Sequence, residues 1–199
     1  MNNKVVFFLM FFLLLYACSV EEEKNDNKTF IAKAGLANEY ETSRQTLDAE
    51  ISKNADNITA LIARGNLALD HYDFSNAFSD AARAFRLDSN NFQSRLLYAR
   101  SLINRPTSTE NDKIVAQRHF LKLVNENANN LDAIVGLANT YALLQDFENA
   151  NIWIEKALKI DSKCIDAYRL KGSIFKIRYY AVIEDSDSKK FAEALFDST

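Results

Sequence analysis

"DFENANIWIEKALKIDS", residues Asp146 to Ser162, has a second copy in "DFSNAFSDAARAFRLDS", residues Asp73 to Ser89. The two segments are identical at seven of seventeen positions. The interval between them is too long for one common repeat, but Ala116 divides it, since it lies between Ala77 of one copy and Ala150 of the other. The two parts are about 39 residues and about 34 residues long, which is close to the length of one helical hairpin in repeat proteins. The chain therefore carries a repeat of this kind.

The composition favours helices throughout. The 199 residues are 48% hydrophobic and 26% charged, which is typical of a globular chain, but they include only four glycines and one proline. A sandwich or barrel needs both residue types for its many turns, whereas long helices need neither. The net charge of −3 argues against nucleic acid as a partner, because phosphates require a basic face.

The period and its paired helical segments resemble tetratricopeptide repeats. The resemblance implies an all-α fold, a right-handed α-solenoid of antiparallel helix pairs. Three units and an incomplete fourth fit the spacing: 58–91, 92–130, 131–164 and 165–199. Upstream, residues 29–57 are predicted to form a capping half repeat, with the spacing of a lone second helix between Tyr40 and Asn57. The first helix of the fourth unit is expected to extend about ten residues beyond the register of the others.

The positions that define the family are filled in each unit. The small residue of the first helix corresponds to Gly65, Ala99, Ala138 and Gly172. The alanine of the second helix corresponds to Ala77, Ala116, Ala150 and Ala194. The bulky positions are occupied by Leu61, Phe74, Leu137, Tyr141, Phe147, Tyr168 and Phe175. Small residues let paired helices approach closely, while the wide apolar stripes need a neighbouring hairpin to cover them. The insertion of unit two, "NRPTSTEND", is expected to lengthen the turn inside its hairpin.

Residues 1–17 have the form of a signal peptide. Lys4 precedes an apolar run from Val5 to Leu15, which is too short to span a bilayer as a helix. The following "LYAC" resembles the lipobox of bacterial lipoproteins, in which the cysteine, here Cys18, is lipidated and becomes the new N-terminus. A plain secreted protein and a retained anchor remain alternatives. Residues 18–28, with the acidic run "EEE", are predicted to be a short disordered tether.

An exported location, with the protein anchored to a bacterial membrane through Cys18, follows from this reading. The expected site is the outer membrane, on its periplasmic or surface face. Removal of residues 1–17 leaves 23 basic and 27 acidic residues, a charge of −4. Since Cys18 would carry lipid, Cys164 is left alone and no structural disulfide is expected.

Motifs for catalysis or metal binding do not occur in the sequence. His71 and His119 lie far apart along the chain, and neither a Cys-x-x-Cys nor a His-Glu-x-x-His segment is present. The four glycines are too dispersed for a phosphate-binding loop. The chain is therefore predicted not to be an enzyme and to need no cofactor and no metal. Trp153 and its neighbours Ile152 and Ile154 are expected to pack between helices.

Binding of another protein or peptide is the predicted role. In the family that this chain resembles, the first helices line a concave groove. The matching positions are Ile62, Asn66, Leu69, Leu96, Arg100, Ile103, Val135, Asn139, Ala142, Arg169, Ser173 and Lys176. Amides and guanidinium groups would hold a peptide backbone there, and aliphatic side chains would bury its side chains. A terminal helix of the same chain filling the groove is an equal alternative.

One known use of the fold is a two-carboxylate clamp for chaperone tails, and the sequence argues against it. That clamp needs Lys and Asn in the first unit and basic residues in the third, but the positions hold Ile62, Asn66, Asp132 and Gly136. The leading prediction is an adaptor, scaffold or assembly factor at the cell envelope. One alternative is the N-terminal recognition segment of a longer enzyme or regulator. A self-associating structural repeat is a second alternative.

Overall fold

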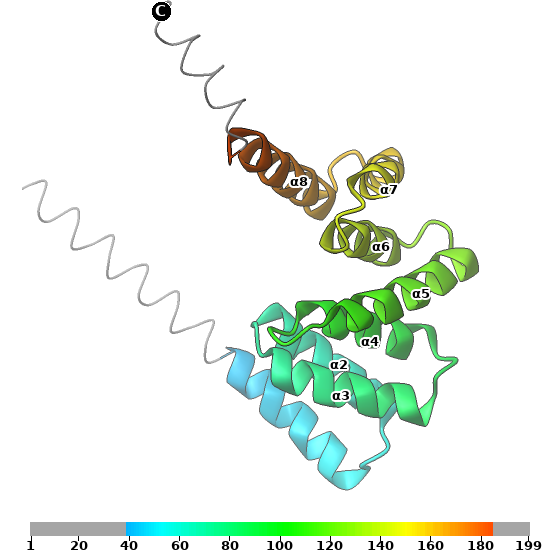
Figure 1. Cartoon of the computed structure of the whole chain (residues 1–199). Coiled ribbons are helices and arrows are strands. Elements are labelled where there is room, and N and C mark those ends of the chain that lie inside the picture. The colour runs from blue at the N-terminus through cyan, green and yellow to red at the C-terminus, as the bar shows by residue number, and fades with distance from the viewer. Residues whose placement is uncertain (1–38, 185–199) are drawn as a thin grey trace, which may run out of the picture. The chain divides into compact units, whose positions relative to one another are not determined.

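A computed structural model describes residues 39–184 of the chain, and every regular element in that range is a helix (Figure 1). The predicted signal peptide, Cys18, the tether, the first part of the capping segment and Ala194 lie outside the described residues. The chain divides into two compact units, Met1–Glu50 and Ile51–Thr199. A helix over residues 39–53 spans this division, within the segment predicted to form the cap. The expectation of an all-helical chain is confirmed for the described residues.

Seven further helices follow within the second unit. They are α2 (Ile58–Asp70), α3 (Phe74–Leu87), α4 (Phe92–Asn104), α5 (Glu110–Glu126), α6 (Leu131–Leu143), α7 (Phe147–Ile160) and α8 (Ile165–Glu184). Each packs against the next, and α2, α4, α6 and α8 also contact one another in order. We call these four the first helices of their pairs. The longer turn of unit two lies between α4 and α5, and α8 has 20 residues where the other first helices have 13.

Side-chain caps explain why the helices begin where they do. Asn57, Asn91 and Asn130 cap α2, α4 and α6, each accepting a hydrogen bond from a backbone N–H in the first turn. Asp73 and Asp146, the first residues of the duplicated stretch, cap α3 and α7 in the same way. The sequence similarity of that stretch thus includes the start signal of the second helix.

Helix α5 begins differently, because it follows the insertion. Thr109 and Asp112 form a capping box, in which each side chain accepts a backbone N–H of the other residue. Arg105 pairs with Asp112 at 2.7 Å, and its guanidinium lies 4.3 Å from the centre of the Phe78 ring. These hydrogen bonds, the one from the Thr109 backbone first, lower the pKa of Asp112 to about 2. The inserted turn is therefore held in place by contacts within the described chain.

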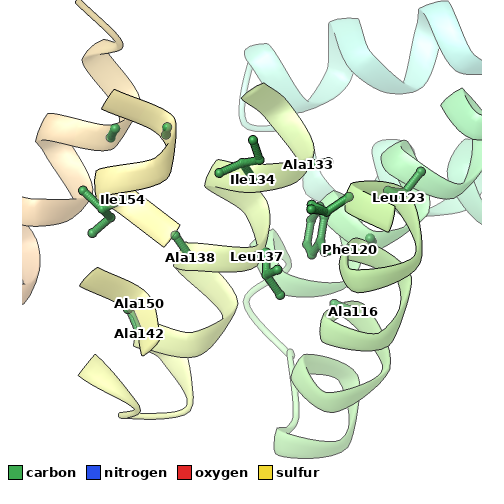
Figure 2. Close-up of a cluster of buried hydrophobic side chains, with 14 of the residues drawn as sticks. Ala116, Phe120, Leu123, Ala133, Ile134, Leu137, Ala138, Ala142, Ala150 and Ile154 are labelled. Carbon is green, nitrogen blue, oxygen red and sulfur yellow. The ribbon is translucent and has the colours of Figure 1, made fainter. Parts of the chain in front are cut away.

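The core of the second unit depends on small residues at helix crossings. Ala77, Ala99, Ala116, Ala138 and Ala150 are all fully buried. Figure 2 shows the largest cluster between α5, α6 and α7, where the ring of Phe120 projects toward α6. The close approach that the alanines permit agrees with the register drawn from the sequence.

Ala150→Leu tests this register directly. Ala150 is fully buried at a crossing point, so a larger side chain must displace its neighbours. We expect the free energy of unfolding to fall by about 1–3 kcal/mol, as overpacked cores do. Thermal denaturation followed by circular dichroism measures the change. An unchanged melting temperature would mean that Ala150 does not lie at a helix crossing.

Three apolar side chains expected in the core are exposed instead. Ile152 is 59% exposed, although its neighbours Trp153 and Ile154 pack into the core as predicted. Tyr168 and Phe175 of α8 are 54% and 72% exposed. Their exposure means that no helix in the described part of the chain covers these three side chains.

Candidate partner-binding surface

The predicted binding residues lie on the four first helices, which run beside one another through the second unit. We call this set the first-helix surface. Leu69, Leu96 and Ala142 are only 7%, 4% and 9% exposed, so they belong to the core and offer almost no surface to a partner. The other nine are half-buried or exposed: Ile62, Asn66, Arg100, Ile103, Val135, Asn139, Arg169, Ser173 and Lys176.

Two of the predicted polar groups bind each other. The Arg100 guanidinium donates to the Asn66 side-chain oxygen at 3.0 Å, which joins α4 to α2. A second nitrogen of Arg100 lies 4.0 Å from the carboxylate of Asp70, whose side chain is 68% exposed. The contact positions the guanidinium on the surface, where one third of the Arg100 side chain remains exposed. These contacts therefore fix the orientation of the Arg100 guanidinium and leave part of the side chain accessible to a partner.

On α6 the surface has a different character. Val135 and Asn139 are half-buried, one turn apart on the same helix face. No hydrogen bond to the Asn139 amide is found within residues 39–184. Ile62 and Ile103, also half-buried, supply aliphatic surface on α2 and α4. This part of the surface therefore offers an amide beside apolar side chains, the combination that holds an extended peptide.

On α8 the predicted residues are well exposed and have local partners. Arg169 pairs with Asp166 at 3.0 Å, one turn away on the same helix. The Ser173 hydroxyl donates to the Arg169 backbone carbonyl at 2.9 Å. The Lys176 ammonium lies 5.9 Å from the centre of the Tyr180 ring. Such exposed contacts contribute little to stability, so these side chains can rearrange toward a ligand.

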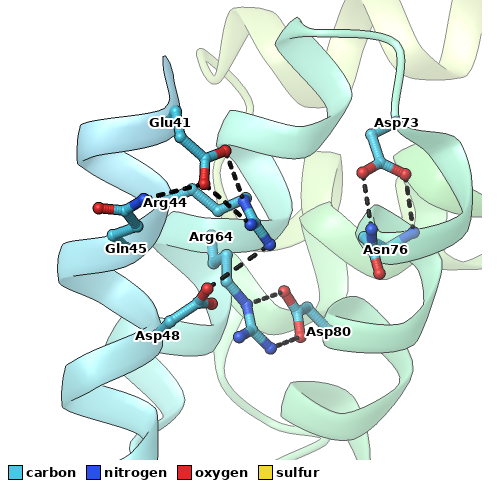
Figure 3. Close-up of polar contacts among 8 residues, drawn as sticks. All are labelled: Glu41, Arg44, Gln45, Asp48, Arg64, Asp73, Asn76 and Asp80. Atoms are coloured by element: carbon cyan, nitrogen blue, oxygen red, sulfur yellow. Dashed lines mark hydrogen bonds and ion pairs between the residues drawn. The ribbon is translucent and has the colours of Figure 1, made fainter. Parts of the chain in front are cut away.

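Sequence reasoning missed two ion pairs that tie the helices together. Arg64 donates two hydrogen bonds to Asp80, at 2.8 and 2.6 Å, and Asp80 is 3% exposed (Figure 3). Arg95, 2% exposed, binds Glu126 at 2.7 Å from a first-helix position that holds Leu61 in α2 and Ile134 in α6. The sequence signal for this pair is Arg95 itself, a charged residue at a position that is apolar in α2 and α6. Figure 3 also shows Arg44 bonded to Glu41 within the first unit.

His119 lies in an aromatic cluster rather than in a site for chemistry. Its ring contacts Phe85 and Tyr98 edge-on, with ring centres 5.1 and 5.6 Å apart. Burial lowers the pKa of His119 below its ordinary value of 6.5, and the nearby charges of Arg95 and Lys122 lower it further. The imidazole is consequently held neutral in the folded chain near neutral pH.

This shift predicts a pH dependence of stability. The unfolded chain regains the ordinary pKa of His119, so as the pH falls through about 6.5 the unfolded state binds more protons than the folded state. The free energy of unfolding should therefore decrease with falling pH in that window. His119→Phe, which cannot be protonated, should flatten the slope in urea denaturation at about pH 7 and pH 5.5. The same slope in both proteins would show that His119 does not cause it.

A pocket of about 900 Å³ lies beside α7, and none of the predicted binding residues lines it. Ile152, Glu155 and Lys159 line it from α7, and Arg178 lines it from α8. Opposite charges on its walls leave it without a strong preference for one sign of ligand. Within residues 39–184, no cluster of three or more metal-ligating side chains could hold an ion, and no helix is long and apolar enough to cross a bilayer.

Comparison with solved structures identifies the fold. A structure described as the thermophilic protein TTC0263 of Thermus thermophilus, a tetratricopeptide-repeat (TPR) protein, matches 83% of this chain and 95% of its own, with a TM-score of 0.59 at 12% identity. The chain has the tetratricopeptide-repeat fold. The crystal structure of MamA covers 83% of this chain and 92% of its own, with a TM-score of 0.56 at 17% identity. No protein-family model and no curated protein matches the sequence.

A third TPR structure carries a ligand. It is the first TPR domain of Spaghetti (RPAP3) bound to the HSP90 peptide SRMEEVD. It matches 61% of this chain and 93% of its own, with a TM-score of 0.50 at 16% identity. The TM-scores show that these proteins share a fold with this chain, and at identities this low they show the fold alone. The identification of the repeat from the sequence is therefore confirmed at the level of the fold.

Proposed function

We propose that this protein is a non-catalytic interaction module, anchored to a bacterial membrane, that acts as an adaptor, scaffold or assembly factor at the cell envelope. The observation that carries the binding role is the arrangement of Ile62, Arg100, Val135 and Asn139 on the first-helix surface. These residues come from three separate helix pairs, whose first helices α2, α4 and α6 contact one another in order. Such a surface can hold several residues of an extended segment at once.

The partner that this surface fits is a peptide or protein segment with alternating apolar side chains. Ile62, Ile103 and Val135 would bury the apolar groups, and the Asn139 amide would bind the backbone. The exposed part of the Arg100 guanidinium favours a carboxylate nearby, because charge-assisted hydrogen bonds to carboxylates are strong. A chaperone tail is not the ligand proposed here, since Ile62 and Asp132 occupy positions where a two-carboxylate clamp needs basic residues.

Peptide selection tests the binding role. A library of random displayed peptides is panned against the full chain and against a variant with Asn66→Ala, Arg100→Glu and Asn139→Ala. We expect a consensus of apolar residues with an acidic group to be enriched on the natural chain and lost on the variant. A control carries Ser75→Ala, Ser79→Ala and Arg118→Glu, which make the same change in charge at exposed positions of α3 and α5.

The same peptide consensus should be enriched on the control. The three proteins should have similar melting temperatures. Enrichment of the same peptides on the variant with Asn66→Ala, Arg100→Glu and Asn139→Ala would mean that another surface binds them. No enrichment on any of the three proteins would contradict peptide binding by this surface.

The membrane anchor is a separate part of the proposal and rests on the sequence "LYAC". Cys18→Ser removes the thiol that would carry lipid. We expect the natural chain to incorporate a labelled fatty acid and to sediment with membranes, and the variant to do neither. A single lipid chain gives weak membrane binding, whereas several chains on one cysteine hold a protein firmly. Membrane sedimentation of the variant equal to that of the natural chain would exclude Cys18 as the anchor.

A further inference from the structure

A stripe of large aromatic side chains on α8 is open to solvent. Tyr168, Phe175 and Tyr179 are 54%, 72% and 54% exposed. Gly172 lies among them, and a Cβ atom added there would meet nothing within 4 Å. At about 100° per residue, the four positions lie within about 60° of one another around the helix axis. We call these four residues the α8 stripe. The rings of Phe175 and Tyr179 stack on it, with centres 6.4 Å apart.

The stripe is separate from the face by which α8 packs onto the repeats. Ala167 and Ile174 are 0% and 3% exposed and belong to the core that α8 shares with α6 and α7. These two side chains point about 120° away from the centre of the stripe. A contiguous exposed apolar surface of this kind marks an interaction site. The stripe is therefore available to a partner of the folded repeats.

Basic side chains border the stripe on both sides. Lys171 and Arg178 lie on one side, and Arg169 and Lys176 lie on the other. Each pair begins about 40° from the edge of the stripe, as the helical spacing requires. An aromatic surface between two basic borders is the arrangement of helices that bind the surface of a membrane.

The charge of α8 is opposite in sign to that of the whole chain. Helix α8 has four basic and two acidic residues, a net charge of +2, whereas the chain carries −3. Arg169 and Lys171 each pair with one carboxylate. Within residues 39–184, no ion pair of Lys176 or Arg178 with a carboxylate is found. Each border thus keeps one cation for an anionic partner.

We propose that the α8 stripe binds the surface of a bilayer that contains anionic phospholipids, with α8 lying in the plane of the interface. Tyrosine rings favour this region, because the ring is apolar and the hydroxyl group stays hydrated. The lysine and arginine stems can lie along the apolar surface while their charged ends reach lipid phosphates. Each such charge near an anionic leaflet strengthens binding.

Charge favours a bilayer over a second copy of the chain. Two α8 helices brought face to face would each carry +2 and repel, whereas anionic phospholipids attract the same borders. The contact goes beyond the proposed anchor at Cys18, since it is non-covalent and involves the repeat domain. It also does not require Cys18 to carry lipid.

A photo-cross-linking amino acid at Phe175 of the full chain tests this contact. The benzophenone analogue of phenylalanine keeps an aromatic ring at this position and reacts with nearby C–H bonds when irradiated. The chain is mixed with vesicles that contain phosphatidylglycerol and phosphatidylcholine in equal amounts. Mass spectrometry should find the probe joined to one phospholipid.

The same probe at Ser173 is the control for orientation. Ser173 is exposed and lies about 130° around α8 from the centre of the stripe, beyond the border formed by Arg169 and Lys176. The lipid adduct there should be about fivefold lower or less. Both proteins have the same N-terminus, so failure of the anchor at Cys18 would change both yields and leave their ratio unchanged.

Two charge variants make the test specific. Lys176→Gln with Arg178→Gln should lower the lipid adduct at Phe175 about fivefold or more, as should vesicles of phosphatidylcholine alone. Arg118→Gln with Lys122→Gln removes the same charge from exposed positions of α5 and should preserve the adduct. Equal yields from the two variants, from the two lipid compositions or from the two probe positions would overturn the proposal. A product with the mass of two chains, or a probe joined to another part of its own chain in place of lipid, would also overturn it.

Discussion

Phe120→Ala is expected to lower the free energy of unfolding by about 3–5 kcal/mol, the range found when a buried aromatic ring is removed. Phe120 is fully buried in the cluster that joins α5 to α6, with Ile134 and Leu137 beside it (Figure 2). The opposite position on α6 is Gly136, and a Cβ there would collide with the ring of Phe120. Removal of the ring therefore leaves a void that no neighbouring side chain can fill. Urea denaturation followed by circular dichroism measures the loss.

Gly136→Ala supplies a control whose effect should change sign. In the natural chain the added methyl group overpacks the fully buried ring, and we expect a cost of about 1–3 kcal/mol. In the Phe120→Ala chain the same methyl group enters the vacated space, and alanine is favoured over glycine in a helix by about 1 kcal/mol. It should then stabilise the protein. Additive losses in the double variant would show that Phe120 and Gly136 do not share this space.

Arg64→Leu should cost about 3–5 kcal/mol, the range for removing one partner of a buried ion pair. Asp80 is 3% exposed and accepts two hydrogen bonds from Arg64 (Figure 3), so the variant leaves a carboxylate in the core without them. The free energy of unfolding from urea denaturation at neutral pH reports the cost. The Arg64 side chain is 26% exposed, so water reaching the site places the result toward the lower end of the range.

Asp80→Asn in the Arg64→Leu chain separates the charge from the packing. Asparagine has the same shape as aspartate but no charge, so the double variant should recover more than half of the lost stability. The Asp80→Asn change alone should cost less than Arg64→Leu, because arginine remains partly solvated. If the double variant is no more stable than Arg64→Leu, the loss comes from packing of the arginine stem rather than from the unpaired carboxylate.

The repeat fold could be predicted from sequence because its signals are local and recur. Asp73 and Asp146 begin the duplicated stretch and also cap α3 and α7, so one pattern encodes both the element and its boundary. Ala77 and Ala150, four residues further on, lie at fully buried crossings. Small side chains at these positions have one physical purpose, the close approach of two helices. A single sequence therefore sufficed for the fold.

Features that depend on a partner in space could not be predicted in this way. Tyr168 and Phe175 match the pattern of core residues, but no described helix covers their face of α8. Asn66 and Arg100 were expected to hold a peptide, and they hydrogen-bond to each other because α2 and α4 bring them within 3.0 Å. The burial of Leu69 and Leu96 likewise depends on how far each helix rotates about its axis. Successive residues of a helix point about 100° apart around its axis, so neighbouring positions can belong to the core and to the first-helix surface.

The most direct test of the interaction role is an affinity purification of the full chain from a detergent-solubilised extract of the cells that produce it. The natural chain is compared with the variant carrying Asn66→Ala, Arg100→Glu and Asn139→Ala, and with the charge-matched control on α3 and α5. We predict that at least one protein is retained by the natural chain and by the control and is lost from the triple variant of the first-helix surface. Identical sets of retained proteins from all three would contradict binding through the first-helix surface.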